Sequence, residues 1–217
     1  MKSVALMSGG KDSFLSTLTA MEQGFDVSLS LTVIPQEDSF MYHVPNAAMA
    51  SYTAKMLGLD WEQVSEENVR KTLENLAHEG FRAIIAGAIA SSYQKTRLES
   101  ICTELHMCLY TPLWLVDQEM ILRELLLRDL HAIIVSVSAE GMEEEDLGKE
   151  IDNNFIRILK ERNRKVGLNI SGEGGEYETF VTGFMQKNLR IVSSETRWKG
   201  QSGHMIIKEV DYRPGNQ

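Results

Sequence analysis

Cysteine, positive charge and long apolar runs are scarce in this sequence. Its 217 residues include two cysteines, Cys102 and Cys108. Two thiols without paired cysteine or histidine neighbours provide neither a disulfide framework nor a zinc site. We therefore expect both thiols to be buried and reduced, as in a cytoplasmic protein.

Membranes and nucleic acids are not expected partners. No stretch approaches the roughly 18 apolar residues that a transmembrane helix requires. The first apolar run ends at Gly9 and is too short for a secretory signal. The 22 Lys and Arg residues stand against 31 Asp and Glu, and this net charge of −9 disfavours duplex nucleic acid as a main partner.

Apolar runs alternate with helical patterns through the first two-thirds of the chain. The predicted strands cover residues 2–7, 27–34, 61–64, 82–88 and 108–110. Strands that alternate with helices predict an α/β domain in which a parallel sheet carries helices on both faces. Because the pattern changes after about residue 125, we predict one domain over residues 1–125 and a smaller α/β domain over 126–217.

Three further segments carry local expectations. Asn46 is expected to cap a helix that runs to Leu57. The acidic run 143–146 is expected to be a solvated helix start. Residues 171–179 are polar and rich in glycine, and we call them the glycine-rich segment. They precede two predicted strands, 189–193 and 205–210.

Near the N-terminus, another segment with glycines lies between the first predicted strand and the first predicted helix. This phosphate loop consists of Ser8, Gly9, Gly10, Lys11, Asp12 and Ser13. Two glycines allow a tight turn and close approach of a ligand, and the N-terminus of a helix favours an anion. The spacing fits neither GxxxxGK[ST] nor GxGxxG. A plain turn capped by Asp12 would leave most of these residues unexplained, so we predict a phosphate site.

The phosphate loop resembles the SGGxDS signature of the PP-loop ATP pyrophosphatases, whose ATP-binding domain is Rossmann-like (HUP-type). Further segments resemble the diphthine–ammonia ligase family, namely residues 41–46, 87–89, 92–99, 112–114 and 172–179. The resemblance extends over nearly the whole chain, and these segments are its most recognisable parts. The resemblance implies a ligase that amidates diphthine on translation elongation factor 2 with ammonium, through an acyl-adenylate, and releases AMP and pyrophosphate. It also implies Mg²⁺ beside ATP, because cations offset the charge on the leaving pyrophosphate.

From this resemblance we assign residues to a site. ATP is expected at the phosphate loop with Val33 and Gly87 beside it, Mg²⁺ on Asp12, and the second substrate between the two domains. The expected catalytic residues are Lys11, Asp12, Arg97 and Glu176. The expected substrate contacts are Tyr42, His43, Tyr93, Gln94, Arg97, Glu173, Gly174, Gly175, Glu176, Tyr177 and Glu178.

Several assignments have a structural alternative. Arg97 could pair with Glu99 on a solvated first helical turn, and Lys95 is open between site and surface. Val33 could be a plain core residue, and a loop histidine such as His43 can be incidental. The carboxylates of the glycine-rich segment could bind the quaternary ammonium of diphthine, take a proton from ammonium, hold Mg²⁺, or form an exposed acidic turn.

Two other functions also stay open. One is a PP-loop enzyme that adenylates or amidates a different small-molecule carboxylate. The other is a regulatory protein that binds ATP or AMP without turnover. Pyrophosphate release on adding ATP, ammonium and substrate separates an enzyme from a binding protein. The oligomeric state is open as well, with a homodimer as one option.

Overall fold

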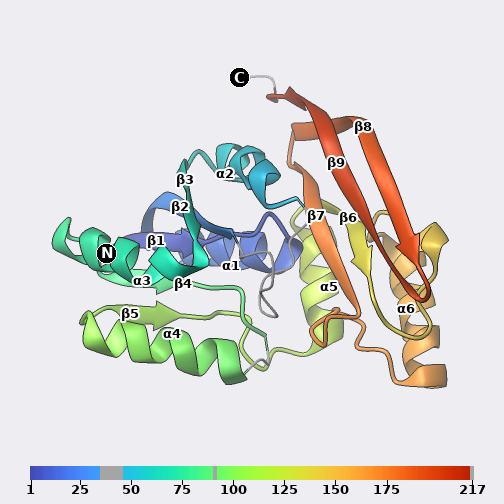
Figure 1. Ribbon diagram of the computed structural model, residues 1–217, viewed down its shortest axis with the longest axis horizontal. Helices are drawn as coiled ribbons and strands as arrows, with labels where there is room; N and C mark the ends of the chain where they lie inside the picture. Colours follow the sequence, from blue (N-terminus) through green and yellow to red (C-terminus); the bar gives the residue numbers. More distant parts are fainter. Residues whose placement is uncertain (35–45, 90–91, 216–217) are drawn as a thin grey trace. The chain divides into compact units, whose positions relative to one another are not determined.

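A five-stranded parallel sheet and a four-stranded antiparallel sheet make up the computed structural model (Figure 1). It describes residues 1–34, 46–89 and 92–215, with the backbone alone for 92–94. The chain divides into two units, Met1–Leu115 and Val116–Gln217. Our sequence-based boundary near residue 125 lies inside helix α5 (Gln118–Leu127), which packs on a strand of the second unit.

The first unit contains the parallel sheet that the sequence predicts. Its strands are β1 (Lys2–Leu6), β2 (Asp26–Ile34), β3 (Asp60–Ser65), β4 (Ala83–Ile85) and β5 (Cys108–Tyr110). All four strand pairs are parallel, and their order is β3-β2-β1-β4-β5. The order reverses between β1 and β4, and ligands in such sheets bind beyond the carboxyl ends of the strands at that point.

Helices cover both faces of this sheet, as expected. They are α1 (Lys11–Glu22), α2 (Ala50–Leu57), α3 (Val69–His78) and α4 (Ser92–Glu104). Right-handed crossovers place α1 and α2 on one face and α3 and α4 on the other. An ion pair between Arg70 of α3 and Glu104 of α4 links the second pair. In the part of the chain that the structure describes, no helix is both long and apolar enough to cross a membrane.

Two local expectations in the first unit are corrected. Asn46 is at the N-cap position of a short 3₁₀ turn (Ala47–Met49) that leads into α2, but its side chain makes no capping hydrogen bond. Cys102 is buried, and burial raises the pKa of its thiol to about 11. Cys108 is exposed at the start of the edge strand β5, so only one of the two thiols belongs to the core.

The second unit is built on antiparallel strands. They are β6 (Leu130–Val137), β7 (Tyr177–Phe184), β8 (Lys187–Lys199) and β9 (Ser202–Arg213). Each strand pairs with two others, which closes the order β6-β7-β8-β9. Helices α5 and α6 (Asn153–Val166) complete this unit. Strand β7 begins inside the glycine-rich segment, where we expected no strand, and it alternates a buried Tyr177 and Thr179 with the less buried Glu178.

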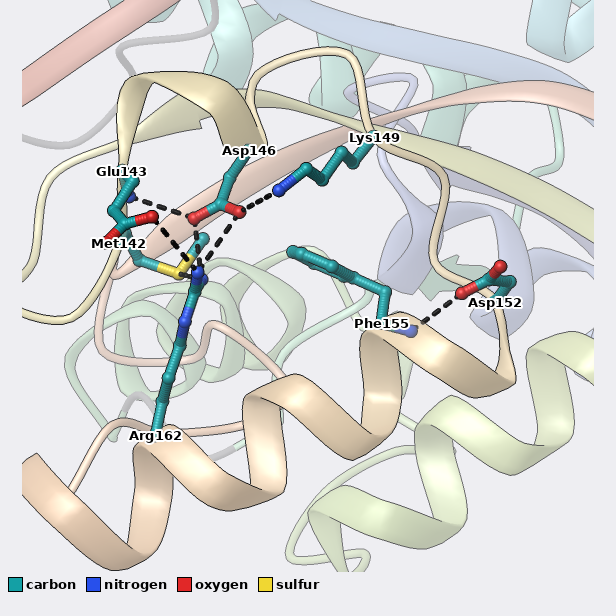
Figure 2. A network of polar contacts seen from close by, with 7 residues as sticks. All are labelled: Met142, Glu143, Asp146, Lys149, Asp152, Phe155 and Arg162. Atoms are coloured by element: carbon teal, nitrogen blue, oxygen red, sulfur yellow. Dashed lines mark hydrogen bonds and ion pairs between the residues drawn. The ribbon is translucent and has the colours of Figure 1, made fainter.

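The acidic run 143–146 is not the solvated helix start that its composition indicates. Its first three members are exposed, but Asp146 is fully buried at the end of a 3₁₀ turn (Glu144–Asp146). Figure 2 shows why: Arg162 and Lys149 bind its two oxygens at 2.6 and 2.9 Å. Burial alone would raise the pKa of Asp146, but these hydrogen bonds outweigh it and hold the pKa below its usual range.

Candidate functional site

The phosphate loop lies at the carboxyl end of β1, where the strand order reverses. Gly9 has a φ of +88°, a left-handed conformation that glycine adopts without strain. Helix α1 begins at Lys11, and the residue before it, Gly10, has no side chain to cap the helix. The first N–H groups of α1 therefore suit an anion at this end of the sheet.

Hydrogen bonds between the two serines hold the loop in shape. The hydroxyl of Ser13 donates to the carbonyl of Gly10 at 3.0 Å and accepts from the amide of Ser8 at 3.3 Å. The amide of Gly10 in turn donates to the hydroxyl of Ser8 at 3.4 Å. Both serines thus fix the backbone around the start of α1.

Lys11 and Asp12 form an ion pair inside this loop. The side chain of Lys11 is 3% exposed, and its Nζ lies 2.8 Å from Oδ2 of Asp12. The other carboxylate oxygen, Oδ1, is shielded from solvent and has no hydrogen-bond partner within the described residues. Such an oxygen costs free energy until a donor or a cation binds it. Mg²⁺ is commonly held by one or two carboxylates together with substrate phosphates, so Asp12 fits this ion.

Gly87, which follows β4, lies directly against the first turn of α1. A Cβ atom at this position would be 2.7 Å from the amide nitrogen of Ser13 and 2.8 Å from the carbonyl carbon of Asp12. Real side chains do not approach backbone atoms so closely. Only glycine lets the chain after β4 pass here, so Gly87 lies beside the phosphate loop, and its contact with ATP stays a prediction.

Val33 occupies the part of β2 that extends beyond β1. The last ladder pair between the two strands is Leu6 with Leu31, and the amide of Met7 still donates to the carbonyl of Leu31. Backbone groups alternate in direction along a strand, so those of Val33 point to the side where β1 has ended. The side chain of Val33 packs against the core. Val33 therefore combines a core side chain with backbone groups that lie beyond the end of the described β1–β2 ladder.

Arg97 and Lys95 have different partners from those considered above. Nη1 of Arg97 lies 3.4 Å from Oε1 of Glu66, which follows β3 at the carboxyl end of the sheet. Lys95, and not Arg97, pairs with Glu99, and it also lies 4.6 Å from the centre of the Trp114 ring. Lys95 therefore has the surface pairing, whereas Arg97 reaches toward the sheet edge.

Four predicted substrate contacts cannot be placed. Tyr42 and His43 lie outside the described residues, and so do the side chains of Tyr93 and Gln94.

In the second unit, the glycine-rich segment forms a turn that leads into β7. Gly172 and Gly175 have φ values of +76° and +82°. A Cβ atom on Gly172 would lie 2.7 Å from the carbonyl oxygen of Tyr177. The ring of Tyr177 is 2% exposed, and its hydroxyl donates to the carbonyl of Ile170 at 2.5 Å. Tyr177 thus anchors the turn in the core.

Glu176 is the carboxylate of this segment with the most defined surroundings. The side-chain and backbone N–H groups of Asn169 both donate to its Oε1, the latter at 3.2 Å. Its Oε2 is shielded from solvent and, within the part of the chain described, has no hydrogen-bond partner. A Cβ atom on Gly174 would lie 2.7 Å from Oε1, so this glycine makes room for the carboxylate.

The remaining carboxylates of the segment have other settings. Glu178 belongs to β7 and lies opposite Ser136 of β6, whereas Glu173 lies in the turn. Among the residues that the structure describes, no three or more acidic, histidine or cysteine side chains gather as a metal site would require.

Comparison with known proteins identifies the family. The diphthamide synthase N-terminal domain matches residues 1–109, and the diphthamide synthase C-terminal domain matches residues 117–212. The human diphthine–ammonia ligase is 31% identical over 90% of this chain and 84% of the human protein. This chain belongs to the diphthine–ammonia ligase family.

Other members of the diphthine–ammonia ligase family differ in length. That of Schizosaccharomyces pombe is 32% identical over 90% of this chain, and that of Saccharomyces cerevisiae is 27% identical over all of it. The chain spans only 36% and 38% of these two proteins. Among solved structures, a tRNA thiolase from Methanococcus maripaludis aligns with 59% of this chain and 57% of its own, at 14% identity and a TM-score of 0.43.

Membership in the diphthine–ammonia ligase family confirms the resemblance that the motifs carry, and with it the use of ATP by a ligase. The roles of individual residues stay predictions. The sequence analysis did not identify Asn169, whose N–H groups bind Glu176, or Gln118, which donates to Asn169. It also missed Thr32, whose hydroxyl donates to the carbonyl of Met7 at 2.7 Å and fixes the start of the phosphate loop. The glycines indicated the segment around Glu176, but no local sequence pattern indicates the amides of Asn169 and Gln118.

Proposed function

We propose that this chain amidates diphthine on translation elongation factor 2, with ATP and ammonium as co-substrates. The observation that carries the proposal is the position of the phosphate loop, which lies where the strand order reverses and has Gly87 packed against its backbone. The chain that contains this loop belongs to the diphthine–ammonia ligase family. The exposed and buried free thiols are compatible with a cytoplasmic enzyme.

ATP would bind at the carboxyl ends of β1, β2 and β4. The N-terminus of α1 would receive its phosphates, with Lys11 adding charge, and the backbone edge of Val33 would receive the adenine. Asp12 would hold Mg²⁺ through Oδ1, and the ion would offset charge on the leaving pyrophosphate. Arg97 would exchange its long contact with Glu66 for a phosphate or substrate carboxylate.

The proposed reaction has two steps. In the first, a carboxylate oxygen of diphthine attacks the α-phosphorus of ATP, the bond from that phosphorus to the bridging oxygen breaks, and pyrophosphate leaves. In the second, ammonium first gives a proton to solvent, and the nitrogen of the resulting ammonia attacks the acyl carbon. The bond from that carbon to the AMP oxygen breaks, and the nitrogen gives a second proton to solvent. The glycine-rich segment, with Glu176 as its best-defined group, would bind the second substrate.

Product analysis tests this proposal. The chain is incubated with Mg²⁺, ATP, ammonium and elongation factor 2 that carries diphthine. Chromatography should show AMP and pyrophosphate in equal amounts, and mass spectrometry should show the amide on the factor. Formation of ADP and phosphate would overturn the reaction class. Pyrophosphate release with a different carboxylate but not with diphthine would favour the alternative amidating relative, and ATP binding without turnover would favour a regulatory protein.

A further inference from the structure

The uncharged side chains of Asn169 and Gln118 hold the carboxylate of Glu176 in position. Asn169 saturates Oε1 of Glu176 with two donors, one from its side chain and one from its backbone. The carbonyl oxygen of the Asn169 amide accepts from Nε2 of Gln118 at 3.0 Å. Gln118 is itself oriented, because its Oε1 accepts from the amide of Ser171 at 3.2 Å. Each amide therefore has one rotational orientation that satisfies both neighbours.

The consequence of this arrangement is a carboxylate with two unlike oxygens. Oε1 has two donors, whereas Oε2 is shielded from solvent and lacks a hydrogen-bond partner in the described part of the chain. Both groups that bind Oε1 are uncharged, so these contacts leave the negative charge of Glu176 uncompensated. A shielded, charged oxygen of this kind is stabilised by a cation that also donates hydrogen bonds.

We propose that Asn169, held by Gln118, is a positioning residue that aims Oε2 of Glu176 at the ammonium substrate. The inference rests on the proposed function and extends it by assigning the ammonium subsite. Ammonium supplies both positive charge and N–H donors. The quaternary ammonium of diphthine has charge but no N–H group, so it leaves the lone pairs of Oε2 unsatisfied.

The packing of Gly174 supports this geometry. A Cβ atom there would lie 2.8 Å from Nδ2 of Asn169 as well as 2.7 Å from Oε1 of Glu176. Any larger residue would therefore push apart the two groups whose contact orients Oε2. The glycine protects the hydrogen bond as well as the turn.

Asn169→Ala tests the proposal through steady-state kinetics of amide formation on diphthine-bearing elongation factor 2. Loss of the side-chain donor should raise the KM for ammonium by about tenfold to a hundredfold, because hydrogen bonds to charged groups are strong. The KM for ATP should stay within about twofold. In a Glu176→Gln background, Asn169→Ala should add little further loss, because both changes affect one interaction.

Asn169→Asp should give the KM for ammonium a pH dependence that a purely structural role of Asn169 does not predict. At neutral pH two carboxylates face each other and the donor is lost, so ammonium binding should fall further than in Asn169→Ala. As the pH falls and the pair takes up one proton, a carboxyl O–H can replace the amide donor. The KM for ammonium, expressed relative to the wild type at each pH, should recover in Asn169→Asp and not in Asn169→Ala.

Two further variants complete the design. Asn188→Ala removes an exposed asparagine of β8, whose side chain donates to the nearby carbonyl of Gln186 at 3.3 Å, and should change neither KM. Gln118→Glu keeps the acceptor for Ser171 but loses the donor to Asn169, and should give a smaller rise in the KM for ammonium. This variant also serves if Asn169→Ala fails to fold.

The outcomes separate the inference from the function on which it rests. If the wild type makes no amide, the proposed function falls whatever the variants do. If the wild type makes the amide and the Asn169 and Gln118 variants keep its KM for ammonium, the positioning role falls alone. A rise in the KM for the diphthine-bearing factor instead of ammonium would also overturn it, and would place the quaternary ammonium at Oε2.

Discussion

The phosphate loop and the glycine-rich segment have the same local plan but different charge. Each uses glycine at positive φ, and each holds a carboxylate with one oxygen bound and the other shielded and unpartnered among the described residues. In the phosphate loop, the bound oxygen of Asp12 contacts the ammonium group of Lys11. In the glycine-rich segment, the bound oxygen of Glu176 accepts hydrogen bonds from two uncharged N–H groups of Asn169.

This difference suits the two turns to the different ligands that we propose for them. The Lys11–Asp12 pair is close to neutral, so it can lie beside phosphates and share a divalent cation with them. The donors on Glu176 are uncharged, and this setting is the one that we propose for a cation. In this proposal the charge of the nearest partner, and not the shape of the turn, distinguishes the two sites.

Asp146 is a third carboxylate for this comparison, and both of its oxygens are bound by cationic side chains in the core (Figure 2). Asp146→Asn should destabilise the chain by about 3–5 kcal/mol, since it leaves the charge of Arg162 without its partner. Calorimetric unfolding should show this loss, while ATP affinity at a temperature where the variant is folded stays unchanged. A stable variant with weakened ATP binding would contradict the structural role.

Glu176→Gln should have the opposite profile. It keeps size and shape but removes the charge, so unfolding should change little and ATP affinity should be preserved. Single-turnover amide formation should fall by about thirtyfold to thousandfold, or about 2–4 kcal/mol. If ATP affinity falls instead, Glu176 belongs to a Mg²⁺–ATP site. If neither quantity changes, the segment is an acidic turn without a role in binding.

Gly87→Ala addresses the other turn through its packing. The added Cβ must displace the first turn of α1, and such overpacking costs about 1–3 kcal/mol. We expect ATP affinity to fall by about tenfold to a hundredfold in calorimetric titration. Gly58→Ala is the control, because Gly58 has positive φ but open space around its Cβ position. It should lower stability without changing ATP affinity; equal effects of both variants on ATP would refute the close approach.

The sequence predicted the features of this comparison that depend on local pattern. Alternating apolar runs and helices gave the parallel sheet, and the glycines marked both turns. The pattern could not show β7, because its alternating buried residues start inside a polar segment. It could not show that Asp146 is buried while its acidic neighbours are exposed, since the deciding partner, Arg162, lies on a separate helix. Nor could it pair Gln118 with Asn169, 51 positions away.

The smallest expected effect comes from exposed carboxylates around His131 on β6. Nδ1 of His131 lies 2.6 Å from Glu150, and Nε2 lies 3.2 Å from Asp129. The hydrogen bond with Glu150 is the main cause that raises the pKa of His131 in the folded chain. A raised folded-state pKa gives stability that is complete below the unfolded value, about 6.5, and is lost as pH rises through the folded value.

His131→Gln isolates this contribution. The side chain of His131 is 42% exposed, so after allowance for solvent screening we expect only a few tenths of a kcal/mol. The difference in unfolding free energy between wild type and His131→Gln should therefore be largest near pH 6 and shrink by pH 8. High salt should reduce it further, because exposed ion pairs are screened. A difference that grows with pH would mean that neutral His131 is the stabilising form, and a difference as large as that of Asp146→Asn would remove the distinction between exposed and buried carboxylates.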